Sequence, residues 1–190
     1  MANNSYKIPV VGKTLEEILS SKKINDTTTA WDIYQRFYKD SILNGFFNII
    51  GFCLALDIKV KWDTDLNDYE YGYIDTTEKT IYINQNHSKT SQIFTIFHEL
   101  GHFFLHKGHG LKHRNQLFYS LEQKEEEEMA NSFAAEILMP YDDVKSICEQ
   151  QQIKAQEELI QALLSKFNSR GISRVSRDTV VYRLKVLGFM

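Results

Sequence analysis

Two histidines four residues apart, with a glutamate directly after the first, are the residues of this chain best suited to chemistry: His98, Glu99 and His102. On a helix, His98 and His102 would lie one turn apart on one face, with Cβ atoms about 5–6 Å from each other. Two imidazoles so placed can bind one zinc ion, which in catalytic sites takes three protein ligands and keeps one position for water. Glu99 would flank this face and could serve as general base for that water.

The neighbouring residues favour a metal site, although the five-residue pattern also arises by chance in unrelated chains. Apolar residues form one broad arc of the predicted helix, and Phe94 and Leu105 border the histidines on the other side. Imidazoles next to apolar surface need a polar partner, and a metal ion supplies one. The alternative is a helix that merely carries two exposed histidines and a glutamate.

The third ligand is predicted to come from a second helix. His106 cannot join His98 on one ion, because eight residues of helix rise about 12 Å. Glu127 is the better candidate, since small residues lie on its side of the following helix and permit close packing against the metal helix. Asn131, one turn later, could hydrogen-bond a ligand. The alternative is that Glu127 belongs to a solvated acidic first turn, residues 125–128.

Two longer segments resemble the motifs of the ImmA/IrrE metallopeptidase family. They are residues 98–106 (HELGHFFLH) and residues 127–140 (EEMANSFAAEILMP), and residues 175–188 are similar to that family's C-terminal helix. The resemblance covers roughly residues 45–190. It implies a gluzincin-type Zn²⁺ site with His98, His102 and Glu127 as ligands and Glu99 as catalytic acid and base. Met129 departs from the pattern, because relatives often carry a second glutamate there.

The remaining sequence predicts an α+β fold that is mostly helical, with a small three-stranded antiparallel or mixed sheet packed on the metal-binding helix. Residues 27–57 show helical spacing of aromatic residues, residues 57–62 alternate as a strand does, and residues 69–74 and 79–84 are typical of a hairpin. We expect a polar N-terminal arm over residues 1–26, a zinc metallopeptidase domain over 27–165, and a C-terminal helical pair over 166–190 packed on the same domain.

Substrate contacts are predicted around this sheet. An extended peptide can pair with an edge strand, and Ile81–Asn84, directly before the metal helix, is the predicted edge. A plain protected sheet edge is an equal alternative. Candidate donors for stabilising an oxyanion or contacting substrate are His106, Tyr82, Tyr119 and Arg183. Residues 107–121 could form a mobile lid or a plain surface loop.

The basic tail raises a rival function. Residues 166–190 are predicted to form a helix-turn-helix-like pair, in which Arg174, Arg177, Arg183 and Lys185 could contact DNA phosphates. The alternative, which we favour, is that apolar residues pack this pair on the domain while the basic residues face water.

The global composition fits a small enzyme of the cytoplasm. The chain has 190 residues, 43% of them hydrophobic, and a net charge of −3, which gives no general signature of polyanion binding. No secretion signal and no long apolar run that could span a membrane are evident. Cys53 and Cys148 are expected to be free thiols.

These observations predict a zinc-dependent endopeptidase that cleaves a protein partner. The family resemblance implies a transcriptional repressor of the phage or mobile-element type as substrate, so that the enzyme would act as an anti-repressor. It fits a stress-response regulator or a toxin-type module equally. The alternative from another class is a DNA-binding or partner-binding regulatory protein whose metal site is structural or vestigial.

Overall fold

The computed structural model describes residues 42–43, 46–47, 49–105, 121–150, 156–169 and 175–190. Its elements follow the chain in the order β1 (Ile42–Leu43), β2 (Phe46–Phe47), α3 (Ile49–Ala55), β3 (Lys59–Asp63), β4 (Gly72–Asp75), β5 (Thr80–Asn84), α4 (Lys89–Leu105), α5 (Leu121–Leu138), α6 (Tyr141–Gln150), α7 (Gln156–Ser169) and α8 (Arg177–Val186). The mostly helical α+β class predicted from the sequence is confirmed. The predicted N-terminal arm, residues 1–26, lies outside the described residues.

The strands β3, β4 and β5 form a mixed sheet in the order β3-β5-β4. β3 runs parallel to β5, and β4 runs antiparallel to it. The prediction that Ile81–Asn84 forms an edge is therefore wrong, because β5 is the central strand of this sheet. The physical reason lies in the side chains: β5 is buried at four of its five positions, whereas β3 exposes its two lysines, which suits a strand with one neighbour.

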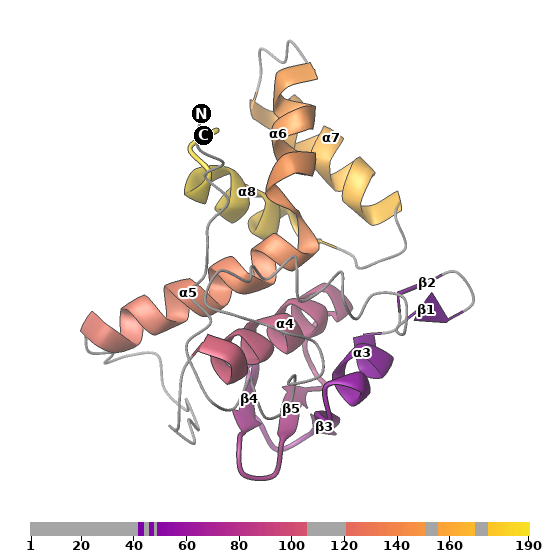
Figure 1. Ribbon diagram of the computed structural model, residues 1–190, viewed down its shortest axis with the longest axis vertical. Coiled ribbons are helices and arrows are strands. Elements are labelled where there is room, and N and C mark those ends of the chain that lie inside the picture. The colour runs from indigo at the N-terminus through magenta and orange to yellow at the C-terminus, as the bar shows by residue number, and fades with distance from the viewer. Residues whose placement is uncertain (1–41, 44–45, 48, 106–120, 151–155, 170–174) are drawn as a thin grey trace.

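Alternation along the strands sets the two faces of the sheet. Ile74, Ile81 and Ile83 are almost fully buried and belong to the main hydrophobic cluster, while Lys61 and Tyr82 belong to the opposite face. Helix α4 packs across the buried face, and α5 packs on α4 (Figure 1).

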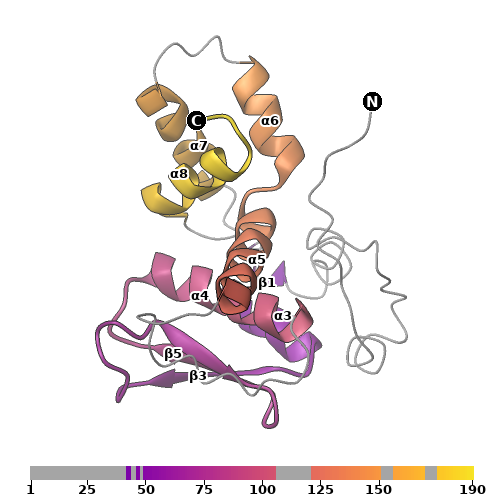
Figure 2. The same cartoon turned by 90° about the vertical axis from the view of Figure 1, so that its left-hand side faces the viewer.

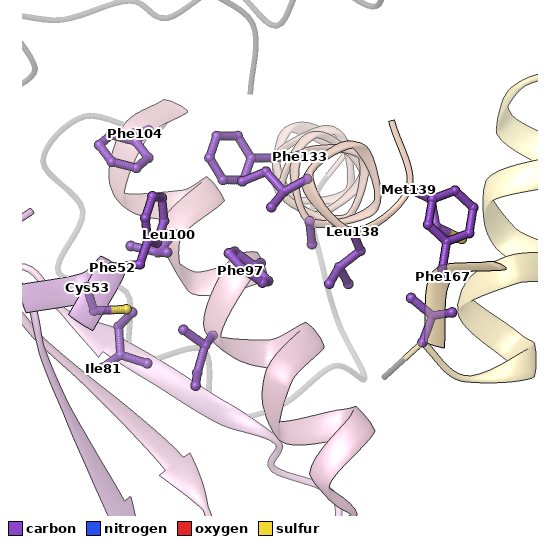
Figure 3. Close-up of a cluster of buried hydrophobic side chains, with 14 of the residues drawn as sticks. Phe52, Cys53, Ile81, Phe97, Leu100, Phe104, Phe133, Leu138, Met139 and Phe167 are labelled. Atoms are coloured by element: carbon purple, nitrogen blue, oxygen red, sulfur yellow. The ribbon is translucent and has the colours of Figure 1, made fainter. Parts of the chain in front are cut away.

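Large apolar side chains fill the space between these layers. Phe97, Leu100 and Phe104 of α4 lie between the residues of α3 and β5 on one side and Phe133 and Leu138 of α5 on the other (Figure 3). This packing fixes α4 at the centre of the domain, with neighbours on two sides. Side chains of α4 that project between these two neighbours therefore have defined positions relative to both the sheet and α5.

Residues 27–57 agree only partly with the helix predicted there. Residues 49–55 form α3, but residues 42–43 and 46–47 form the short antiparallel pair β1 and β2. The sequence signal for this pair is Asn44-Gly45, a dipeptide typical of tight hairpins. Residues 27–41 lie outside the described part of the chain.

The helices α6, α7 and α8 lie beyond α5, on the side away from the sheet (Figure 2). Helix α8 contacts both α5 and α7. Its N-terminus is capped by Ser176, whose side chain accepts a hydrogen bond from the backbone of Thr179. Because α5 carries Glu127 near its start and meets α8 toward its end, one helix joins the predicted metal site to the C-terminal helices.

Candidate metal centre

Three side chains from two helices converge at the predicted metal site. His98 and His102 on α4 have their Nε2 atoms 3.0 Å apart. The Glu127 carboxylate on α5 lies 3.3 Å from each, with one oxygen toward His98 and the other toward His102. One ligand atom from each residue lies within 4.8 Å of the others, so the three could hold a single metal ion. Two imidazole nitrogens and one carboxylate oxygen are a donor set typical of catalytic zinc.

The close approach of α5 to α4 brings Glu127 within reach. At the contact, a Cβ atom on Gly101 would lie 2.9 Å from the Cα atom of Ala130. Ala130 and Ala134 are both fully buried in this helix interface. Small residues at the crossing let the two backbones approach closely, as the small-residue stripe after Glu127 predicted.

Asn131 orients one of the two imidazoles. Its Oδ1 atom lies 2.9 Å from Nδ1 of His98. Because an amide oxygen only accepts hydrogen bonds, Nδ1 must carry the proton, and the lone pair of a neutral His98 then lies on Nε2, toward His102 and Glu127. The aromatic ring of Phe94 stacks against the same imidazole, with centroids 6.4 Å apart. Asn131 therefore contacts one of the two imidazoles of the triad.

His98 and Glu127 stabilise each other's charged form. Burial alone would raise the pKa of Glu127, but hydrogen bonds from His102 and His98 outweigh it and hold that pKa far below the ordinary value. Burial opposes the charged form of His98, yet the hydrogen bond to Glu127 and the charges of Glu99 and Glu127 raise its pKa. Glu127 is therefore ionised at neutral pH, as a metal ligand must be.

Glu99 lies between α4 and the sheet and is only 5% exposed. Burial raises the pKa of its carboxyl group, and the charges of His98 and His102 oppose this rise only in part. The backbone N–H of Ile74 in β4 donates a hydrogen bond to the carboxylate. A carboxyl with a raised pKa, next to two imidazoles, is suited both to accept and to return a proton.

The hydrogen bond from Ile74 places the outer edge of β4 beside this site. The N–H of Asn84 donates to the carbonyl of Tyr71 at 3.0 Å, so alternate residues of β4 bond to β5. Gly72 and Ile74 lie between these positions and direct their backbone N–H and C=O groups away from β5. In the described part of the chain no strand pairs with this side of β4. The edge strand next to the candidate site is thus β4.

Two of the four candidate donors lie elsewhere. Tyr82 is on the face of the sheet opposite the metal helix, where its hydroxyl contacts Glu78 and Lys61. Arg183 is 1% exposed, pairs with Glu136 and donates to the carbonyl of Met139. The structure therefore does not bring Tyr82 or Arg183 to the triad. His106 and Tyr119, like most of the predicted loop 107–121, lie outside the described residues.

Two of the four basic residues predicted to contact DNA are engaged within the protein. Arg177 forms an ion pair with Glu157 at 2.7 Å, and Arg183 is buried, so neither presents an uncommitted charge to a phosphate. Lys185 is exposed, and Arg174 lies outside the described residues. The apolar packing predicted for these helices is observed at Val175, Val180 and Leu184.

Comparison with known proteins agrees with this geometry. Residues 53–185 match the model of a peptidase family described as the IrrE N-terminal-like domain. The chain belongs to this family. The match includes every residue of the triad, Glu99 and Asn131, and it ends within α8.

The IrrE N-terminal-like match confirms the family resemblance seen in the two motifs. A search of curated proteins gave no match. Among the residues that the structure describes, no helix is long and apolar enough to cross a membrane.

Sequence reasoning missed one feature of the site and one buried contact outside it. One is the backbone of Ile74, which contacts Glu99 although no side-chain pattern marks it. The other is Glu136, the partner of Arg183. Its only sequence signal is a charged residue within an otherwise apolar stretch, residues 133–139, where a buried acid requires a partner.

Proposed function

We propose that this chain is a zinc-dependent endopeptidase that cleaves a protein partner in the cytoplasm, with His98, His102 and Glu127 as zinc ligands. The observation that carries the proposal is the convergence of two imidazoles and one carboxylate, with the buried carboxyl of Glu99 beside them. A purely structural metal site has no need of such a group. Membership of a peptidase family supports the same conclusion.

Each residue has a defined task in this proposal. When bound, zinc acts as a Lewis acid toward the scissile carbonyl and toward water. Glu99 takes a proton from the attacking water on its carboxylate and returns it to the amine of the leaving chain. Asn131 keeps the Nε2 lone pair of His98 directed at the metal. The hydrogen bond from Ile74 holds the Glu99 carboxylate next to the outer edge of β4.

The substrate is proposed to bind as an extended segment along β4. The N–H and C=O of Gly72 and the C=O of Ile74 point outward and can pair with such a segment. The N–H of Ile74 donates to Glu99, so the segment would lie next to that carboxyl group. By the family resemblance, the proposed substrate is a transcriptional repressor of the phage or mobile-element type.

The decisive experiment combines zinc analysis of the purified protein with cleavage of a co-encoded repressor. Glu99→Gln should keep its zinc but lose activity by at least about 10²-fold, because it removes the base. Glu127→Gln should lose zinc, whereas Glu128→Gln, its exposed neighbour on the same helix, should keep both zinc and activity. Equal cleavage by wild type and Glu99→Gln would refute the mechanism.

The second candidate is a DNA-binding or partner-binding regulator that keeps the metal site for structure. It is favoured only by the basic character of the tail, and two of its arginines are already paired within the protein. DNA affinity that falls steeply with salt would support this rival. Absence of binding at low salt would exclude DNA as a partner.

A further inference from the structure

Two tyrosines lie at β4 on the face of the sheet that points away from α4. Tyr71 and Tyr73 are two residues apart, and so they lie on the face opposite Ile74, which packs toward α4. Tyr71 is 47% exposed and Tyr73 is half-buried. Both rings therefore lie next to an edge of the sheet that no described strand covers.

Both rings are held in place by a stacking partner. Tyr73 stacks on Tyr82, with centroids 4.8 Å apart and an interplanar angle of 13°. The Tyr82 hydroxyl donates to Glu78 at 2.9 Å and accepts from Lys61 at 3.4 Å. The second tyrosine, Tyr71, stacks on the imidazole of His87 at 4.3 Å. Rings held in this way lose little conformational freedom when they bind a ligand.

The loop that leads into β4 is fixed as well. Asn84, which is completely buried, donates from its side-chain amide to the carbonyls of Asn67 and Glu70 at 2.9 and 2.8 Å. The start of the edge strand is therefore anchored to the central strand of the sheet. Tyr71 is the last residue of this loop before β4. Because the loop is fixed, the Tyr71 ring has a defined position relative to the edge of the sheet.

The register predicts what a substrate would meet there. Gly72 directs its N–H and C=O outward, and Ile74 directs its C=O outward while its N–H donates to Glu99. A segment that binds antiparallel along β4 would therefore form hydrogen bonds with both groups of Gly72 and with the carbonyl of Ile74. The residues opposite Tyr71 and Tyr73 would then be non-hydrogen-bonded pairs, in which the Cα atoms lie about 4.5 Å apart and the side chains are closest. Such pairs between aromatic and β-branched or aromatic residues stabilise sheets.

We propose that Tyr71 and Tyr73 determine substrate selectivity by favouring β-branched or aromatic side chains on the substrate residues opposite them. This inference rests on the proposed function and narrows it to an extended segment with alternate apolar residues. Because Ile74 contacts Glu99, the substrate residue opposite Ile74 would lie beside the catalytic carboxyl. The substrate residue opposite Tyr73 is its direct neighbour in the bound segment. The selected position is therefore at a fixed, short distance from the cut.

The test uses a library of blocked decapeptides randomised at every position. The zinc-loaded protein is incubated with the library, and the products are sequenced by mass spectrometry. Wild type should enrich Val, Ile, Thr and aromatic residues at two positions that are two residues apart and fixed relative to the cut, the first opposite Tyr73 and the second opposite Tyr71. Tyr73→Ser should reduce the enrichment at the first position by about two- to fivefold. Tyr73→Phe should retain it, because the ring and its stack remain.

Three further arms separate selectivity from a structural defect. Tyr71→Ser should reduce the enrichment at the second position, opposite Tyr71, and leave the enrichment at the first position unchanged. Tyr69→Ser is the matched control, because Tyr69 is 88% exposed in the preceding loop and lies outside the strand. Zinc content should equal that of wild type in every variant. Unchanged enrichment in both Tyr73→Ser and Tyr71→Ser would overturn the inference.

A binding readout keeps the inference independent of cleavage. The same library is selected by affinity on immobilised, zinc-loaded Glu99→Gln, with and without Tyr73→Ser. The enrichment at the position opposite Tyr73 should be present among the peptides bound by Glu99→Gln and reduced when Tyr73→Ser is added. If wild type cleaves no peptide or protein, the proposed function fails, whereas enrichment that Tyr73→Ser does not change defeats this inference alone.

Discussion

Gly101 of α4 lies so close to Ala130 of α5 that any side chain on Gly101 would press a Cβ atom to within 2.9 Å of the Ala130 Cα. The neighbour is backbone, which cannot swing aside as a flexible side chain would. This contact sets the distance between the helix that carries both imidazoles and the helix that carries Glu127. The geometry of the candidate metal site therefore depends on a residue that binds no metal.

Replacing Gly101 by Ala should weaken zinc binding. Alanine favours an isolated helix over glycine by about 1 kcal/mol, but overpacking against the Ala130 backbone typically costs about 1–3 kcal/mol. We expect a small net loss of stability and zinc affinity lower by about tenfold, as for other residues that support ligands. Competition with a chelating dye measures the affinity. Wild-type affinity in Gly101→Ala would show that α5 can shift without cost.

Asn131→Ala should also lower zinc affinity, by about 10- to 100-fold, because His98 loses the acceptor that fixes its Nδ1 proton. Ser132→Ala, at the adjacent position of the same helix, is the control and should bind zinc as wild type does. The same chelator competition gives both values. Equal affinities in the two variants would mean that Asn131 does not orient the imidazole.

Without metal, the stability of the protein should depend on the pH through His98 and Glu127. The pKa of His98 is raised above 6.5, so its contribution is complete below that pH and is lost as the pH rises through the folded value. The pKa of Glu127 is lowered, so its contribution is present above pH 4.5 and is lost only in strong acid. The pair should therefore stabilise the chelator-treated protein most between pH 4.5 and 6.5.

Urea unfolding of the chelator-treated protein at pH 6 and pH 9 measures this effect. Wild type should lose more stability between the two values than His98→Gln does, because the variant has no imidazole at this position to titrate. An identical loss in both proteins would contradict the raised pKa of His98.

Arg183 and Glu136 form a buried ion pair that ties α8 to α5. Arg183→Met should destabilise the protein by about 3–5 kcal/mol, because it leaves the Glu136 carboxylate buried without its partner. Adding Glu136→Gln should restore much of that loss, since the orphaned charge is then removed. Urea unfolding of the two single variants and the double variant completes the cycle. Additive losses would show that the two side chains do not interact.

The two cysteines should differ in reactivity. Burial raises the pKa of the Cys53 thiol to about 12 and leaves it inaccessible, whereas Cys148 is half-buried and its pKa is raised less. At pH 8.5 the folded protein should gain one iodoacetamide adduct, slowly, and two in urea, as measured by intact mass. Cys148→Ser should gain none while folded. Two adducts at similar rates in the folded protein would contradict the burial of Cys53.

The elements that position the site were largely predictable from the sequence, and the exceptions have specific causes. Residues 89–105 and 121–138 carry helical patterns and fold as α4 and α5. The pair β1 and β2 was missed because the aromatic spacing around Phe46 and Phe47 outweighed the hairpin signal at Asn44-Gly45. The edge strand was misassigned because β3, which comes first in the chain, pairs with β5 rather than with β4.

The sequence by itself determined which face of α4 carries His98 and His102, the place of Glu99 beside that face, and the spacing of Glu127 and Asn131, one turn apart on the next helix. These relationships follow from the fixed rise and rotation of a helix, which depend only on residue spacing. Only the tertiary structure decided that β4 is the edge, that Ile74 donates to Glu99, that Arg183 is buried against Glu136, and that Tyr82 faces away from the metal. These contacts join segments whose pairing depends on how remote surfaces pack, and no local periodicity encodes that pairing.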